Sequence, residues 1–198
     1  AKLWDAESGS LLARLVGHRS EVTAVAISPD SRWLFTGDAR GRLRLWEANT
    51  GQTVWQAEGH SRSVTAAYFL AGGDRVLTAS VDNTVAQWDV RTGRERTDAI
   101  LKHPDAVTSM VVSTDGRRVL TTCADRKARL WNLETGDEMG TLHAQDGGST
   151  AVCLRRPGRR GTLLVVDRVP DIRLEPANAA VDAAQFAAGP RRLRRPQL

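Results

Sequence analysis

The sequence has few cysteines, and their scarcity excludes two kinds of small architecture. Its 198 residues contain only Cys123 and Cys153, and no C-x-x-C pair is present. Disulfide-stapled domains and cysteine-ligated zinc sites need more cysteines at closer spacing. We therefore expect neither a disulfide framework nor a metal site, and we expect a reducing compartment, the cytoplasm.

Long apolar runs and nucleotide-binding motifs are also missing. The longest apolar run near the C-terminal end, Leu163 to Val166, is far shorter than the roughly 18–20 residues that a transmembrane helix requires. The chain has no G-x-x-x-x-G-K-[ST] loop, no G-x-G-x-x-G turn and no H-x-x-x-H pair. We expect no membrane contact and no bound cofactor.

Positive charge is concentrated at one end of the chain. Residues 151–198 contain ten arginines and four acidic residues, whereas residues 1–150 are close to neutral. The arginines cluster at 155–160 and 191–195, and such clusters can bind nucleic acid or an acidic partner. Because no aromatic residues for base stacking lie between them, we favour a solvated tail and do not expect nucleic-acid binding.

The chain does contain a regular repeat. Trp4, Trp46, Trp88 and Trp131 are spaced by 42, 42 and 43 residues. The last three tryptophans each stand next to last in one of three related stretches, which read TGDARGRLRLWE, TASVDNTVAQWD and TTCADRKARLWN. A fixed period of this length indicates a repeat architecture.

Histidines recur with the same period. Gly17-His18 and Gly59-His60 lie 42 residues apart, Lys102-His103 follows 43 residues later, and Leu142-His143 follows after 40. A valine lies four residues after each of the first three histidines. Together with the Trp-containing stretches, this pattern resembles the WD40 repeat, strongly over residues 1–142 and weakly over residues 150–193.

The resemblance implies an all-β fold, a WD40-type β-propeller with four-stranded antiparallel blades. Alternating apolar residues and frequent Gly/Pro turns independently favour short strands over helices. Residues 22–27 are apolar on both faces, which predicts a first strand packed between neighbouring blades. The expected strands are 1–5 and 10–16 in a half blade; 22–27, 32–36, 42–46 and 52–57; 64–69, 74–78, 84–88 and 94–101; and 107–112, 117–121, 127–131 and 137–142.

We therefore divide the chain into two regions. Residues 1–142 form a half blade and three full blades, and residues 143–198 form degenerate or aberrant blades with the basic tail. In the second region, 150–152, 163–166, 172–175 and 181–186 echo successive strands of the earlier repeats. Two interpretations stay open: the blades have diverged, or a frame change has replaced the natural continuation.

The chain starts at Ala1, inside a repeat, so we expect the natural N-terminus to lie upstream. We expect an incomplete propeller, whose uncovered strand edges favour association. Its partners would then include further blades of the parent chain or a second copy.

In the WD40 family, a hydrogen-bonded set of His, Ser/Thr, Asp and Trp supports each blade. Carried over by position, the set is His60, Thr78, Asp82 and Trp88 in the third blade, and His103, Thr121, Asp125 and Trp131 in the fourth. The second blade has His18, Thr36 and Trp46, but Arg40 stands where the acid is expected. We expect this blade not to complete the network in the usual way, with Asp38 as the candidate substitute.

The same residue types could be read as a catalytic triad. A triad is defined by the geometry and roles of its members, and a catalytic site does not need a copy in each blade. We therefore predict structural roles for these residues, no catalytic residue and no enzymatic activity.

Binding residues should lie on the face that carries the loops between blades and the turns between the second and third strands of each blade, where WD40 propellers commonly bind peptides. Positions that differ between repeats can carry specificity, since repeated positions support the fold. The candidates are Arg19, Glu21, Arg40, Arg62, Ser63, Asn83, Asp105 and Arg126.

The resemblance implies a non-catalytic scaffold that binds protein or peptide partners. One alternative is a regulatory or targeting module of a larger enzyme, such as a bacterial Ser/Thr kinase or NTPase. Another is nucleic-acid binding through the Arg-rich C-terminal tail, which would require steep salt dependence.

Overall fold

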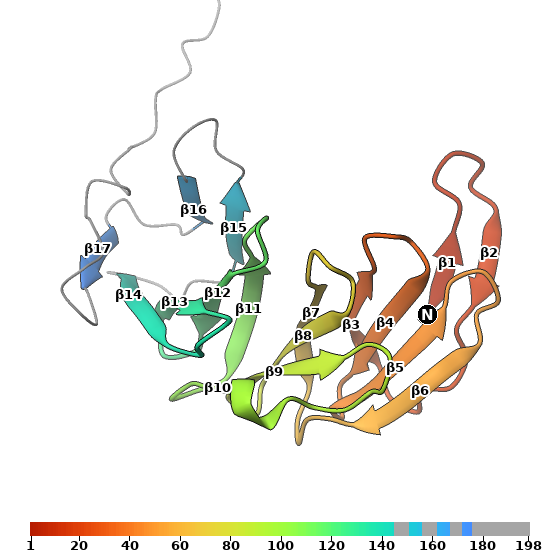
Figure 1. Cartoon of the computed structure of the whole chain (residues 1–198), viewed down its shortest axis with the longest axis horizontal. Coiled ribbons are helices and arrows are strands. Elements are labelled where there is room, and N and C mark those ends of the chain that lie inside the picture. The colour runs from red at the N-terminus through yellow and green to blue at the C-terminus, as the bar shows by residue number, and fades with distance from the viewer. Residues whose placement is uncertain (145–150, 156–161, 167–171, 176–198) are drawn as a thin grey trace, which may run out of the picture.

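Alternating apolar residues between short turns produce an almost purely β structure. The structure is a computed structural model that describes residues 1–144, 151–155, 162–166 and 172–175. Its described residues contain one short 3₁₀ helix, η1 (Thr97–Ala99), and are otherwise strands and turns. Antiparallel sheets follow one another along an open arc (Figure 1).

The arc begins with a half blade. Strands β1 (Lys2–Trp4) and β2 (Leu11–Arg14) form a two-stranded antiparallel sheet. Their turn is stabilised by Asp5, whose Oδ1 accepts hydrogen bonds from the Ser8 amide and hydroxyl. Trp4 is 53% exposed, whereas Trp46 of the next blade is 1% exposed. The difference follows from the two-stranded sheet, which provides no inner strands beside Trp4.

Three full blades follow, and their spatial strand order is the sequence order. The second blade is β3 (Val22–Ile27), β4 (Trp33–Asp38), β5 (Arg42–Glu47) and β6 (Thr53–Glu58). The third is β7 (Val64–Phe69), β8 (Arg75–Ser80), β9 (Thr84–Asp89) and β10 (Leu101–Lys102). The fourth contains β11 (Val107–Val112), β12 (Arg118–Cys123), β13 (Lys127–Asn132) and β14 (Glu138–Ala144).

The outer strand of the third blade differs from the prediction. In place of a strand over 94–101, an isolated bridge joins Trp88 and Glu95, η1 follows, and only β10 pairs with β9. Residues 94–98 are all polar or charged, so they lack the alternating apolar residues that support β6. The outer edge of this blade therefore leaves the sheet before rejoining it.

The region after β14 also departs from the expected blade. Strands β15 (Ala151–Arg155) and β16 (Thr162–Val166) form an antiparallel hairpin, but β17 (Ile172–Glu175) pairs with β14. The segment expected as the third strand of a fifth blade is thus the fifth strand of the fourth blade's sheet. The outer edge of β14 provides the unpaired backbone groups that such a strand needs. The echo at 181–186 lies outside the described residues.

The core consists of apolar layers between neighbouring blades. Phe35, Leu43 and Leu45 of the second blade pack against Val64 and Val76 of the third, and all five are completely buried. A second layer joins the third and fourth blades through residues such as Leu77, Val85, Val107, Met110 and Val119. Each blade therefore buries its apolar surface against its neighbours.

Hydrogen bonds also connect the first strands of adjacent blades. The Thr23 hydroxyl donates to the Val64 carbonyl at 2.6 Å, and the Thr65 hydroxyl donates to the Val107 carbonyl at 2.9 Å. Both bonds cross from one sheet to the next near the start of the inner strand. These two hydrogen bonds fix the position of each inner strand relative to the next one, at the strand ends that carry the inter-blade loops.

Candidate binding face and its supporting hydrogen-bond networks

The third blade brings its predicted network residues together. His60 Nδ1 lies 2.9 Å from Asp82 Oδ2, and His60 Nε2 lies 2.7 Å from Thr78 Oγ1. Trp88 Nε1 donates to the same hydroxyl at 2.7 Å. In a neutral imidazole with Nδ1–H facing the carboxylate, Nε2 accepts the Thr78 proton. The chain of bonds therefore runs from Trp88 through Thr78 and His60 to Asp82.

The Asp82 carboxylate is held by further donors. It accepts the Ser61 amide at 3.0 Å and the Thr84 hydroxyl at 2.6 Å. Burial raises the pKa of Asp82, but the hydrogen bonds from His60 and Thr84 outweigh this effect and lower the pKa below its usual value. The network is thus built around an ionised carboxylate that also ties the loop before β7 to the β8–β9 turn.

The second blade completes an equivalent network with a different acid. His18 Nδ1 lies 2.9 Å from Asp38 Oδ2, and Nε2 lies 2.7 Å from Thr36 Oγ1, which also accepts Trp46 Nε1 at 2.8 Å. Asp38 stands two residues before Arg40 and is completely buried. Asp38 therefore takes the place of the acid expected at Arg40, because Asp38 and Thr36 leave β4 on the same face and both reach His18.

The fourth blade contains all four expected residues but connects them differently. His103 Nε2 lies 2.8 Å from Thr121 Oγ1, and Trp131 Nε1 donates to that hydroxyl at 2.9 Å. His103 Nδ1 is buried and has no hydrogen-bond partner among the described residues. The expected hydrogen bond between His103 and Asp125 is therefore absent from this blade's described network.

Asp125 pairs with Arg129 instead. Both guanidinium terminal nitrogens contact its carboxylate, one at 3.3 Å, and Arg129 Nε lies 3.7 Å from Glu138. The third blade has Ala86 at the position of Arg129, because the repeat step here is 43 residues. It also has Ser61 and Thr84 where the fourth blade has Pro104 and Lys127.

Pro104 has no backbone N–H, and the lysine side chain replaces a hydroxyl that contacts the acid. The fourth blade therefore lacks two donors that hold Asp82 near His60, and it adds a guanidinium that attracts the acid elsewhere. These three substitutions explain the different pairing.

The fourth-blade histidine is buried close to the guanidinium of Arg129. Burial, followed by the positive charge of Arg129, lowers the pKa of His103 to about 4. Burial opposes ionisation of Asp125, but hydrogen bonds from Arg129 and Cys123 keep its pKa below the usual value. His103 is therefore neutral at physiological pH.

The turns between the second and third strands place polar residues at one face. Gly41, Asn83 and Arg126 have φ values of 80°, 74° and 66° at equivalent positions. Asparagine adopts this left-handed conformation at lower cost than a long side chain such as arginine. Arg126 is therefore held in a strained backbone position, with its side chain exposed at the turn.

The loops before β3, β7 and β11 and the turns after β4, β8 and β12 lie at the same ends of the strands, so the eight candidate residues share one face. Six are exposed: Arg19, Glu21, Arg40, Arg62, Asp105 and Arg126. Ser63 and Asn83 are only partly exposed. The Ser63 carbonyl accepts a hydrogen bond from Ser80 Oγ at 2.9 Å, and the Asn83 carbonyl accepts one from the His103 amide at 2.8 Å. Both residues therefore also support the loops.

Comparisons with known proteins agree with this architecture. The family described as "WD domain, G-beta repeat" matches residues 9–47, 51–89 and 96–132. The chain belongs to the WD40-repeat family. The crystal structure of the computationally designed Ika8 protein is similar, with 29% sequence identity and a TM-score of 0.68. That match covers 78% of this chain and 46% of the designed chain, so this chain spans less than half of that protein's length. No curated protein matches the chain.

The all-β, incomplete WD40 propeller predicted from the sequence is therefore confirmed. WD40 repeats generally form non-catalytic surfaces for protein interaction. Within the described ranges, no helix is long and apolar enough to span a membrane. The same described residues contain no group of three or more His, Cys, Asp or Glu side chains that could hold a metal ion.

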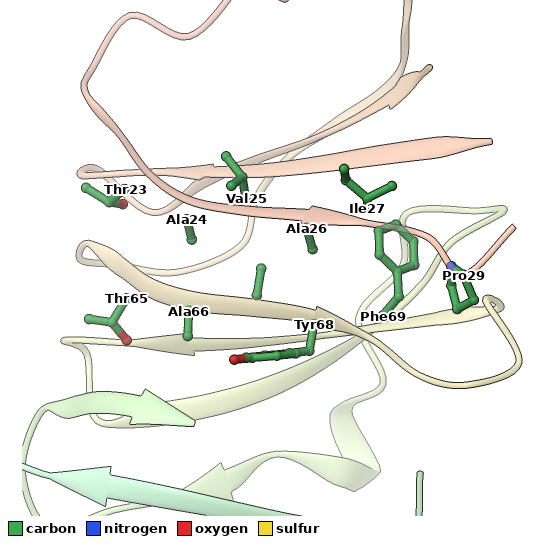
Figure 2. Close-up of a pocket in the computed structure, with 11 residues that line it drawn as sticks. Thr23, Ala24, Val25, Ala26, Ile27, Pro29, Thr65, Ala66, Tyr68 and Phe69 are labelled. Atoms are coloured by element: carbon green, nitrogen blue, oxygen red, sulfur yellow. The ribbon is translucent and has the colours of Figure 1, made fainter. Parts of the chain in front are cut away.

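An apolar groove of about 500 Å³ lies between β3 and β7 of this WD40 arc. Figure 2 shows Ala24 and Ala26 on one side of β3 and Val25 and Ile27 on the other. The alanines pack against the third blade, but Val25 and Ile27 are 64% and 59% exposed. The prediction that both faces of 22–27 are covered was wrong, because no described inner strand lies on the Val25 side.

Three features of this region were missed by sequence reasoning alone. Arg129 redirects Asp125, and the indole N–H of Trp55 donates at 2.7 Å to the carbonyl of Val90, tying β6 to the third blade. A second pocket has charged side chains in its lining, and Arg44 is one of them. When the repeats are aligned, Arg44 and Arg129 stand where the third blade has Ala86. This difference was the available sequence signal for the Arg129–Asp125 pair and for the pocket at Arg44.

Proposed function

We propose that this WD40 chain is a non-catalytic scaffold that binds protein or peptide partners through the face of the inter-blade loops. The observation that supports it is the contrast between repeated and non-repeated positions. His60 and Thr78 are buried in a network, whereas Arg62 and Asp105 are exposed and occur once each. Such a division is typical of repeat proteins, in which the repeated residues support variable binding surfaces.

The network residues are poorly suited to catalysis. Both ring nitrogens of His60 are occupied by Asp82 and Thr78, and the side chain is 1% exposed. A general base must reach a substrate proton within hydrogen-bond distance. The buried imidazole serves the fold, which supports a binding function for the exposed residues.

A double substitution at the binding face tests the proposal. Arg62→Glu with Asp105→Lys leaves the net charge unchanged, and Arg94→Glu with Glu134→Lys is the matched control at the opposite ends of the strands. Tagged proteins would be incubated with nuclease-treated cell extract, and bound proteins quantified by mass spectrometry. We expect a set of partners that the wild type and the control retain and the face variant loses.

Two outcomes would overturn the scaffold proposal. One is a wild-type protein that enriches no partner above a tag-only sample. The other is equal loss, or equal retention, of every partner by the two double variants when both give the wild-type circular dichroism spectrum.

A further inference from the structure

We infer that the second blade has an oxyanion-binding pocket, formed by Arg19, Arg42 and Arg44, which takes an acidic or phosphorylated side chain of a partner peptide. This inference deepens the proposed scaffold function and rests on it. It adds a ligand chemistry and extends the candidate face from Arg19 to Arg42 and Arg44, which that face did not include.

The pocket lies between the loop that enters the second blade and the outer strands of that blade. Its volume is about 330 Å³, which falls within the range of small-ligand sites. It is lined by Arg19 from the loop, Arg42, Leu43 and Arg44 from β5, and Gln56, Ala57 and Glu58 from β6. A side-chain carboxylate or phosphate with its connecting methylene groups would fit this volume.

The charge in the pocket is unbalanced. Three arginines but only one acidic residue, Glu58, line it, and the Glu58 carboxylate lies 3.4 Å from Arg42. The side chains of this pair are 39% and 84% exposed, and such exposed pairs are weak. Glu58 is therefore easily displaced by a better-placed anion.

The guanidinium of Arg44 is held in place by its neighbours, but no acidic side chain balances its charge among the described residues. Its guanidinium carbon lies 5.5 Å from the Trp46 ring centroid, and a side chain at Gly17 would overlap the guanidinium. No carboxylate pairs with Arg44 among the described residues, since Asp38 instead accepts from His18 and from the amides of Arg40 and Arg42. A stacked guanidinium with free donors is suited to binding a carboxylate or phosphate.

The fourth blade shows what an arginine at this position binds. Arg129 has the register of Arg44, because Thr121 faces Arg129 as Thr36 faces Arg44. Arg129 contacts the carboxylates of Asp125 and Glu138. In the second blade neither acid is present at the equivalent place, so an external oxyanion would occupy the corresponding donors of Arg44.

Of the three full blades, only the second has arginine at all three of these pocket positions. The third blade has Ser61, Thr84 and Ala86 at the same positions, and its network is complete without them. The fold therefore does not need Arg19, Arg42 or Arg44. Their presence at one place is better explained by a ligand than by blade stability.

The third blade supplies the test variant, Arg19→Ser with Arg42→Thr and Arg44→Ala. The control, Arg91→Ser with Arg94→Thr and Arg117→Ala, removes the same charge at the opposite ends of the strands. Three fluorescein-labelled short peptides of one backbone sequence would be titrated by anisotropy: one rich in glutamate, one with phosphoserine, and one with serine and glutamine. We expect binding of both anionic peptides and at least roughly tenfold weaker binding by the test variant than by the control.

Arg44→Lys is a second variant that keeps the charge and loses the planar fork, and we expect it to weaken binding without lowering the melting temperature. The inference is overturned if the wild type binds neither anionic peptide, if Arg44→Lys binds as the wild type does, or if the test and control variants bind equally. It is also overturned if these arginines bind an oligonucleotide but no peptide. Retention of all extract partners by the three-arginine variant, with loss in the Arg62/Asp105 variant, would refute this pocket and leave the scaffold function intact.

Discussion

The third and fourth blades contain the same four network residues and differ in how these residues are bonded. In the third blade Asp82 accepts from His60, whereas in the fourth Asp125 pairs with Arg129 and leaves His103 Nδ1 without a described partner. The difference arises from neighbours that are not members of the network. A shared set of residues therefore does not guarantee a shared hydrogen-bond network.

The largest expected effect comes from removing the hydroxyl at the centre of each network. Thr78→Val leaves Trp88 Nε1 and His60 Nε2 unsatisfied in a completely buried place, and we expect it to lower the free energy of unfolding by about 4 kcal/mol. Thr121→Val removes the same two contacts, with Trp131 Nε1 and His103 Nε2, and should cost about as much, because the missing bond to Asp125 does not involve this hydroxyl. Urea unfolding measures both; a much smaller loss for Thr121→Val would show that the missing acid weakens the whole fourth-blade network.

A smaller effect concerns the pH dependence of the fourth blade. The pKa of His103 is about 4 in the folded protein, below its usual value of about 6.5, so the unfolded chain binds the proton more readily. Stability from this group is complete above pH 6.5 and is lost as the pH falls towards 4, by about 3 kcal/mol. His103→Gln should remove this part of the pH dependence in urea unfolding curves.

Transferring the third-blade neighbours sharpens the same prediction. Pro104→Ser with Lys127→Thr and Arg129→Ala should allow Asp125 to bind His103 Nδ1, which raises the pKa of His103 in an NMR titration. Arg129→Lys is the control, because it retains the positive charge beside the ring. A His103 pKa that stays near 4 in the triple variant would show that burial alone sets the value.

The smallest effect distinguishes the turns of the two blades. Arg126→Gly relieves a left-handed backbone conformation and should raise the free energy of unfolding by about 0.5 kcal/mol, after the entropy of the more flexible unfolded chain is subtracted. Asn83→Gly should change stability less, because asparagine tolerates the conformation. Thermal unfolding compares the two; a greater gain for Asn83→Gly would contradict this explanation.

The repeat, the all-β class and the strand positions near the regularly spaced Trp and His residues could be predicted from the residues alone. The inner strands β3, β7 and β11 have the predicted bounds, since alternation and turn residues are local signals. The outer strand of the third blade was not predictable in the same way. A spacing pattern places residues 94–101 in the repeat but does not show that its polar run leaves the sheet.

Which side-chain atoms pair depends on how the strands pack in the folded protein. Asp38 replaces the expected acid because the face of β4 that carries Thr36 is directed at His18, and Arg129 captures Asp125 because adjacent strands bring them together. Arg44, at the same register, lacks such an acid. Hydrogen bonds and ion pairs depend on distances of a few tenths of an ångström, which residue spacing along a chain does not specify.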